Sequence, residues 1–319
     1  MRRIVLKRIA ALAAVGFPAA WQIVAGGMLD MMIIGRAAAQ RGTSGGDSGP
    51  ASDDARAMGP FELPAGARVQ RNLAYGDDPA QHLDVYLPAK AEGAPVFFMV
   101  HGGAWRQGNK ALWRVVKNKV AHWIGKGYIF VSTNYPMLPS ADPLTQADSV
   151  AKALAFVQSK LRSWGGDPAH LVVMGHSSGA HLVALLAVDP AISARHGVTP
   201  WLATVSLDSA AMDVEEIMHR RHFRFYDQAF KQDPEYWRQA SPLHRLTGKP
   251  VTPLLIVCSS RRADSCPQGR ALAAKVAGFG GRAEVLPVPL THSEVNDLLG
   301  TQSAYTDRVD AFLQTLGLK

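Results

Sequence analysis

Cysteine is nearly absent from this sequence, with two residues among 319. So few thiols exclude a disulfide-dense scaffold and a zinc site built from four thiolates. No internal repeat is apparent, and no cluster of His, Cys or Asp has the spacing of metal ligands, so we expect no metal. A disordered chain and a multi-span membrane protein are also excluded, because hydrophobic residues make up 47% of the sequence and charged residues 19%.

Acidic residues are fewer than basic ones, 26 against 34, which leaves a formal charge of +8. Half of this excess lies in residues 1–39, which begin with MRRIVLKR, continue as an apolar stretch from Ile9 to Ile34 and end in three alanines. This order is typical of an export signal cleaved after Ala39, and the alternative is a membrane anchor formed by residues 9–34. No nucleic-acid motif accompanies the charge, so we expect a periplasmic or secreted protein that contacts a membrane only if this segment stays attached.

The rest of the chain divides into a linker and one folded domain. Residues 40–60 are dense in Gly, Ser, Asp and Pro, which predicts a flexible linker before a domain in residues 61–319. From Val69 onward, β-rich runs alternate with segments of helical period, which predicts an α/β domain with a mostly parallel, eight-stranded sheet covered by helices on both faces. The expected strands are Val69–Tyr75, Leu83–Leu87, Val96–Val100, Tyr128–Ser132, Leu171–Met174, Ala203–Leu207, Leu254–Val257 and Val285–Val288, the first two forming an antiparallel pair.

A Gly-x-Ser-x-Gly motif, Gly175–Gly179, stands between an expected strand and an expected helix. A nucleophile held on a sharp turn needs this context, because the glycines let the tight backbone pack without Cβ clashes. A second match, Gly42–Gly46, has no strand before it and no helix after it, so we attribute it to composition. Ser177 is therefore the candidate nucleophile.

The segment His101-Gly102-Gly103-Ala104-Trp105 follows another expected strand. Its consecutive glycines allow backbone N–H groups to turn toward a bound carbonyl oxygen, where each donor stabilises the transition state by about 3 kcal/mol. We expect the N–H groups of Gly103, Ala104 and Ser178 to form an oxyanion hole. The alternative is a tight turn with no chemical role.

Together these motifs resemble the esterase/lipase branch of the α/β-hydrolase family, in particular the carboxylesterases related to hormone-sensitive lipase and the kynurenine formamidase group. The resemblance covers most of residues 69–316 and is carried by His101–Trp105, Asn134–Pro139 with Asp148 downstream, Gly175–Gly179 and Ser241–Leu243. It implies an α/β-hydrolase fold and the hydrolysis of a small-molecule ester through an acyl-enzyme, without a cofactor or metal. Ala104 and Pro136 depart from the residues common in the family, which leaves the subfamily and the substrate open.

The resemblance also implies the order Ser, acid, His, with each residue in a loop after a strand. His292 follows the last expected strand and is the predicted general base. Asp264 is the acidic residue in the loop directly after the strand that ends at Val257, so we predict that it orients His292. Asp208 and Asp213, which follow the preceding strand, are the alternatives.

Both cysteines, Cys258 and Cys266, lie in or beside this predicted acid loop. In an exported protein a disulfide between them would brace the loop. Two buried thiols are the alternative, because free cysteine packs as a small apolar residue.

Residues 210–247 fall between the sixth and seventh expected strands, where a small cap is expected. Their aromatic and Met side chains suggest the roof of a substrate pocket, and plain packing of the cap is the alternative. The basic run His219–Arg224, with Arg261 and Arg262, would favour an anionic acyl group unless it is a solvated surface. An amidase or arylformamidase would use the same residues, and a non-catalytic binding protein would share the fold.

Overall fold

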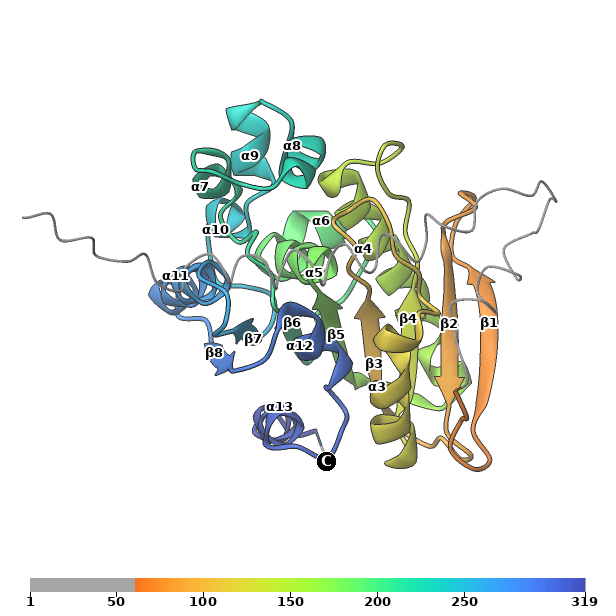
Figure 1. Ribbon diagram of the computed structural model, residues 1–319. Coiled ribbons are helices and arrows are strands. Elements are labelled where there is room, and N and C mark those ends of the chain that lie inside the picture. The colour runs from red at the N-terminus through yellow and green to blue at the C-terminus, as the bar shows by residue number, and fades with distance from the viewer. Residues whose placement is uncertain (1–60, 319) are drawn as a thin grey trace, which may run out of the picture. The chain divides into compact units, whose positions relative to one another are not determined.

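The computed structural model describes residues 61–318, and its strands form one sheet (Figure 1). The order across the sheet is β1-β2-β4-β3-β5-β6-β7-β8. β1 and β4 both run antiparallel to β2, and every other neighbouring pair is parallel. The strands are β1 (Arg68–Ala74), β2 (His82–Leu87), β3 (Ala94–Val100), β4 (Ile129–Thr133), β5 (Gly166–His176), β6 (Ala203–Leu207), β7 (Leu254–Ser259) and β8 (Ala283–Val288). The expected eight-stranded, mostly parallel sheet and its antiparallel entry pair are confirmed.

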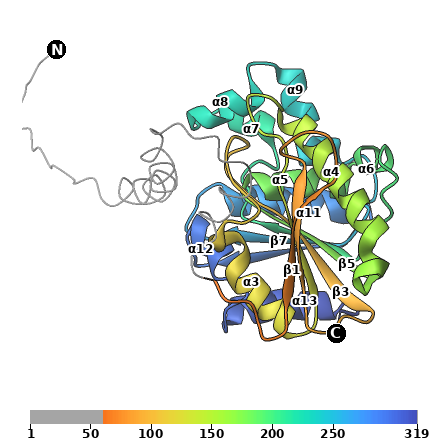
Figure 2. The same ribbon diagram turned by 90° about the vertical axis from the view of Figure 1, so that its right-hand side faces the viewer.

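Helices cover both faces of this sheet, as expected (Figure 2). Successive side chains of a strand point to opposite faces. In β3, Phe98 packs in a core with α4, α5 and α11, whereas Phe97 and Met99 pack in a second core with α3 and α13. The helices on or beside the sheet are α3 (Trp113–Gly125), α4 (Pro143–Lys160), the 3-10 helix η1 (Leu161–Trp164), α5 (Ser178–Val188), α6 (Pro190–Ala194), α11 (Ser265–Gly278), α12 (His292–Asp297) and α13 (Ala304–Gln314).

The start of α4 and the end of η1 show how local sequence sets an element. Asp142 caps the start of this helix by accepting a hydrogen bond from the Thr145 N–H, and Pro143 occupies the first turn. Proline fits there because the first helical N–H groups have no partner inside the helix. η1, which follows α4 directly, ends at Gly165, whose φ of 82° lies in the left-handed region that glycine adopts at low cost.

The segment between β6 and β7 forms four short helices beyond one end of the sheet, coloured cyan in Figure 1. We call these helices the cap. They are α7 (Val214–Met218), α8 (Arg224–Phe230), α9 (Pro234–Gln239) and α10 (Pro242–Arg245). α8 contacts the loop after β3, since the Trp105 ring centre lies 4.9 Å from that of Phe230 and 5.8 Å from that of Tyr226.

The predicted export signal or anchor in residues 1–39 and the predicted linker in residues 40–60 lie outside the described residues. They stay predictions. Within residues 61–318, no helix has both the length and the apolar character needed to cross a membrane.

Cys258, in β7, and Cys266, in the first turn of α11, form a disulfide bond. Both are buried, with 1% and 5% of their surfaces exposed. Of the two alternatives left open by the sequence, the paired state is confirmed. The bond ties the two ends of the β7–α11 loop together.

Replacing both cysteines, Cys258→Ala with Cys266→Ala, should lower the free energy of unfolding. The bond joins residues 8 positions apart, and the loop-closure entropy that it removes from the unfolded chain corresponds to about 2.6 kcal/mol. Urea unfolding followed by circular dichroism measures the loss. The matched control is the wild-type protein with and without reductant, which separates the bond from the smaller side chains. Equal stability of the reduced and oxidised wild type would contradict the prediction.

Candidate active site

Ser177 lies on a sharp turn between β5 and α5 and has a φ of 56°. The flanking glycines are sterically required there. A Cβ on Gly175 would lie 2.3 Å from the carbonyl oxygen of Gly179, and one on Gly179 would lie 2.3 Å from that of Val100. A strained backbone of this kind persists only where its surroundings hold it. The Ser177 N–H donates to the Leu207 carbonyl at 2.9 Å, which ties the turn to the neighbouring strand β6.

Three side chains from separate loops meet at this turn. The Nε2 atom of His292 lies 2.9 Å from Ser177 Oγ, and its Nδ1 atom lies 2.6 Å from Asp208 Oδ2. Ser177 ends the β5–α5 turn, Asp208 directly follows β6, and His292 opens α12. The start of α12 is held by a capping box between Thr291 and Glu294. The serine and histidine identified from the sequence are therefore brought together.

Asp208 is completely buried, and four hydrogen-bond donors surround its carboxylate. Oδ1 accepts from the Ser259 N–H at 2.7 Å and from the Ser265 hydroxyl at 2.5 Å. Oδ2 accepts from His292 and, at 3.0 Å, from Arg262 Nη1. Burial alone would raise the pKa of this carboxyl, but the hydrogen bond from His292 and the charge of Arg262 outweigh burial and hold the pKa well below its usual range.

The prediction that Asp264 orients His292 is wrong, because Asp208, one of the two alternatives, occupies that place. Asp264 lies at the start of α11 and forms an ion pair with Arg262, Nη2 to Oδ1 at 3.3 Å. The loops after β6 and β7 lie side by side because these strands are neighbours in the sheet. Asp213, the other alternative, caps α7 instead. A sequence signal for Asp208 did exist, since it follows its strand directly.

The loop after β3 lies against the turn that carries Ser177. A Cβ on Gly102 would lie 2.8 Å from the Ser177 Cβ. Gly103 and Ala104 both have positive φ, 137° and 53°, so the backbone turns sharply there. The N–H groups of Gly103, Ala104 and Ser178 have no acceptor among residues 61–318. The Ser178 N–H is the first of helix α5, and the first N–H groups of a helix have no partner inside it.

Buried hydrogen bonds fix this loop. The Trp105 indole N–H donates to His181 Nδ1 at 3.2 Å, and His181 Nε2 donates to the Ala240 carbonyl beside the cap at 2.7 Å. Burial lowers the pKa of His181 to about 4, so the ring is neutral and accepts at Nδ1. The Tyr135 hydroxyl donates to the His101 carbonyl at 2.9 Å. These contacts tie the loop after β3 to α5 and to the segment between α9 and α10.

The helix that carries His292 is anchored by a buried lysine of α3. Lys119 Nζ donates to the carbonyl of Asn296 at 2.6 Å and to its side-chain oxygen at 2.9 Å. A second contact joins the same two helices, because Arg114 pairs with Asp297 at 2.8 Å. Only 1% of Lys119 is exposed, and burial lowers its pKa to about 7 against a weaker opposing effect of Asp297.

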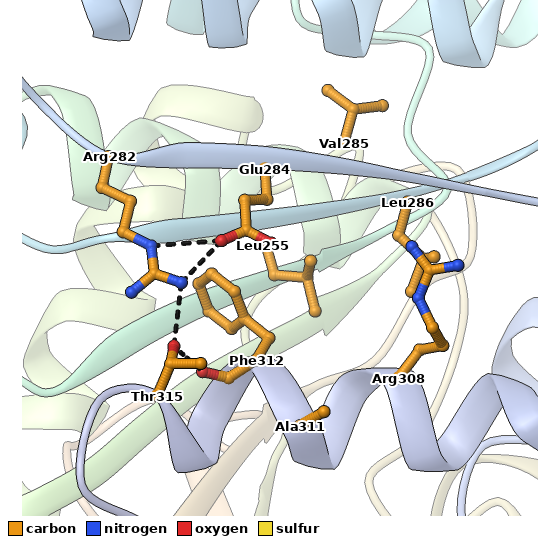
Figure 3. Close-up of a pocket in the computed structure, with 9 residues that line it drawn as sticks. All are labelled: Leu255, Arg282, Glu284, Val285, Leu286, Arg308, Ala311, Phe312 and Thr315. Carbon is orange, nitrogen blue, oxygen red and sulfur yellow. Dashed lines mark hydrogen bonds and ion pairs between the residues drawn. The ribbon is translucent and has the colours of Figure 1, made fainter.

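A hollow on another part of the domain lies between β7, β8 and α13 (Figure 3). Phe312 forms part of its wall, and Arg282 donates to Glu284 and Thr315 there. None of Ser177, Asp208 and His292 lines it. It is a surface depression in which Arg282 pairs with Glu284.

Residues 83–260, more than half of the chain, match the model of the BD-FAE family. The chain is 31% identical over 214 residues to the esterase LipC of Mycobacterium tuberculosis, covering 60% of this chain and 51% of that protein. It is 31% identical over 131 residues to the isoprenylcysteine alpha-carbonyl methylesterase ICME of Arabidopsis thaliana, covering 41% and 30%. The chain thus spans about half the length of the first relative and less of the second.

Solved structures share the fold at low sequence identity. Esterase B of Lactobacillus rhamnosis superposes with a TM-score of 0.67 at 18% identity, covering 91% of this chain and 95% of that one. The butyrate-bound Est2 esterase of Thermogutta terrifontis superposes with a TM-score of 0.64 at 20% identity, covering 80% and 95%. These structures confirm the α/β-hydrolase fold. The family match and the esterase relatives confirm the esterase/lipase resemblance.

Replacing Lys119 with Met should remove a pH-dependent part of the stability. The pKa of Lys119 is about 7 in the folded state and 10.5 in the unfolded state. At pH values between these two, the unfolded chain binds a proton at Lys119 that the folded protein does not. The Lys119 contribution to the free energy of unfolding therefore rises with pH across this window, by up to about 1.4 kcal/mol per pH unit. Lys119→Met lacks this rise.

Urea unfolding of the wild type and of Lys119→Met at pH 7 and pH 10 measures the effect. The free energy of unfolding of the wild type minus that of the variant should increase by several kcal/mol from pH 7 to pH 10. The other titrating groups are common to both proteins and cancel in this difference. Lys117→Met is the matched control, because Lys117 is exposed on the same helix. A stability difference between wild type and Lys119→Met that stays constant with pH would show that Lys119 keeps its charge when folded.

Proposed function

The chain belongs to the BD-FAE family and to the esterase/lipase branch of the α/β-hydrolases, and on that basis we propose that it is a serine hydrolase that cleaves carboxylic esters through an acyl-enzyme intermediate. One observation carries the proposal. The imidazole of His292 lies between the other two side chains, 2.9 Å from Ser177 Oγ and 2.6 Å from Asp208 Oδ2. A nucleophile, a base within hydrogen-bond reach and a group that orients the base are what acyl transfer requires.

The first half of the reaction forms the acyl-enzyme. Ser177 Oγ attacks the ester carbonyl, and its proton passes to His292 Nε2, which needs no movement of the ring because the two atoms are already within 2.9 Å. Asp208 accepts from Nδ1 and so fixes the tautomer with a free Nε2 lone pair. It also stabilises the imidazolium that forms. His292 then gives the proton to the leaving alkoxide as the C–O bond breaks.

The negative charge on the attacked oxygen needs donors that are already in place. The free N–H groups of Gly103, Ala104 and Ser178 supply them in this proposal. The loop that carries the Gly103 and Ala104 N–H groups is held by the Trp105–His181 bond and by Gln146, whose amide donates to the Trp105 carbonyl at 2.8 Å. Donors that need no reorganisation during the reaction stabilise the transition state most.

The second half repeats the same steps with water as the nucleophile. His292 Nε2 removes a proton from water, the hydroxide attacks the acyl carbonyl, and Ser177 leaves with the proton returned by His292. One carboxylic acid and one alcohol are released per ester and per water. Every group that this cycle needs lies among the side chains and N–H groups already named.

Replacing Ser177 with Ala should abolish hydrolysis of p-nitrophenyl acetate, because among residues 61–318 no other hydroxyl is hydrogen-bonded to His292. The expected loss is about 10⁴-fold or more in kcat. Ser44→Ala is the matched control, since Ser44 lies in the second Gly-x-Ser-x-Gly match of the sequence. It should retain wild-type activity. Turnover by a folded Ser177→Ala variant would refute the proposal.

Short-chain esters should be hydrolysed faster than N-formylkynurenine, the substrate that an arylformamidase reading of the same residues predicts. The esterase names of the relatives favour this choice. Comparing kcat/KM for a panel of p-nitrophenyl esters with that for N-formylkynurenine measures it. A higher kcat/KM for the formamide would keep the serine mechanism and reassign the substrate. Absence of both activities, with no labelling of Ser177 by a fluorophosphonate, would favour a binding protein.

A further inference from the structure

Arg262 places a positive charge against the base of the site. Its Nη1 atom lies 3.0 Å from Asp208 Oδ2 and 2.9 Å from His292 Nδ1. Its side chain is 24% exposed, so water screens the charge only in part. A guanidinium has no lone pair with which to accept a hydrogen bond. The Nδ1–H of His292 therefore donates to Asp208, and the contact with Arg262 brings a cation beside the imidazole.

Asp264 lies on the far side of the same guanidinium. Its Oδ1 is 3.3 Å from Arg262 Nη2. The charges of Asp264, Arg262 and Asp208 thus alternate along a line of contacts that ends at His292. Because Coulomb energy falls with distance, Arg262 acts on the imidazole more strongly than Asp264 does, and the two act with opposite sign.

Holding Asp208 in place does not by itself account for Arg262. The Oδ1 atom of Asp208 is satisfied by Ser259 and Ser265, and Oδ2 accepts from His292 at 2.6 Å. The nearer guanidinium nitrogen instead faces both partners of the Asp208–His292 pair. This placement gives Arg262 a direct effect on the charge that His292 takes up when Ser177 attacks.

We propose that Arg262 is a positioning residue that opposes a proton on His292 in the resting enzyme, and that Asp264 moderates this effect. The proposal rests on the hydrolase function proposed above. By disfavouring the imidazolium, Arg262 keeps the base free in more acidic solution. By offsetting part of that charge, Asp264 lets the imidazolium form during attack. The pair therefore sets the lower pH limit of activity.

Three other ionisable groups near the site are uncharged and so do not add to the effect of Arg262 on His292. The His176 ring centre lies 4.7 Å from that of His292, but burial lowers the pKa of His176 well below its ordinary value, so this ring is neutral. Burial raises the pKa of Tyr226 in α8 to about 12 and that of Tyr305 in α13 well above its ordinary value, so both are neutral as well.

Two further groups are present in Arg262→Met and in Asp264→Asn as they are in the wild type. Glu294 in α12 is ionised, because the Thr291 N–H lowers the pKa of its carboxyl. Lys119, whose pKa burial lowers to about 7, changes charge within the range of interest and interacts with His176. Since neither residue is substituted, their contributions cancel when one variant is compared with another.

The test is the pH dependence of kcat/KM for p-nitrophenyl acetate in the wild type, Arg262→Met and Asp264→Asn. Loss of the cation should raise the midpoint of the acidic limb by about one pH unit, and loss of the outer carboxylate should lower it by about half a unit. Arg261→Met is the matched control. It removes the same charge one position away, where the side chain is 56% exposed and pairs with Glu294 at 3.5 Å. Its midpoint should stay within about 0.2 of wild type.

Shifts of opposite sign distinguish this role from a structural one, since loosening the loop would lower kcat without moving the midpoint in two directions. Arg262→Lys should restore the midpoint and leave kcat reduced, because the charge returns without the forked geometry. Unshifted midpoints, or shifts of the same sign, in folded variants whose activity still requires Ser177 would overturn the inference. Turnover by Ser177→Ala would instead overturn the proposed function. If Arg262→Met does not fold, the Asp264→Asn midpoint decides, because the Asp264 side chain is 31% exposed.

Discussion

The buried charge of Asp208 is the constraint on which the site depends. A carboxylate removed from water is costly unless hydrogen bonds and an opposite charge replace its hydration. Here the replacement donors come from the end of β7, the first turn of α11, the loop between them and the start of α12. Each donor must therefore lie close to the end of β6, which Asp208 directly follows. The segments that follow two different strands, β7 and β8, are in this way gathered around one carboxylate.

The parallel sheet makes such an arrangement possible. β5, β6 and β7 are consecutive neighbours, so the loops at their carboxyl ends open on the same edge. Three segments around the site also have a brace of their own. The disulfide closes the β7–α11 loop, the bond of Lys119 to Asn296 holds α12, and the bond of Trp105 to His181 holds the loop after β3. Because each contact holds a different segment, the positions of the site residues do not depend on one long chain of contacts.

The sequence predicted those parts of the site that a local backbone rule specifies. Ser177 needs glycine on both sides of its turn, and His292 follows a strand and opens a capped helix, so both can be recognised from neighbours in the chain. The sheet followed from alternating strands and helices for the same reason. The start of α4 at Asp142 and Pro143 and the end of η1 at Gly165 are set by local rules of the same kind, which act within a few residues.

The acid could not be chosen in this way, because the choice is made between side chains far apart in the chain. Asp208 and Asp264 both lie in loops after neighbouring strands, and either loop is placed to reach His292. The deciding contacts are the bonds of Asp208 to Ser259 and Ser265, which lie 51 and 57 residues away. These two hydrogen bonds hold Oδ1 of Asp208, and Oδ2 then faces the imidazole of His292. Asp264 instead pairs with Arg262, two positions before it in the chain.

The basic character of the chain has a similarly local explanation. Arg261 and Arg262 are adjacent in sequence, yet the first pairs with Glu294 at a partly exposed position and the second enters the buried pair at the centre of the site. Arg220, in the basic run of the cap, pairs with Glu216 one turn away. A count of positive charges cannot separate these cases, because their effect depends on burial and on the nearest carboxylate. In this fold the arginine that matters most to the base already has two carboxylate partners, so an anionic substrate would have to compete with both of them for its charge.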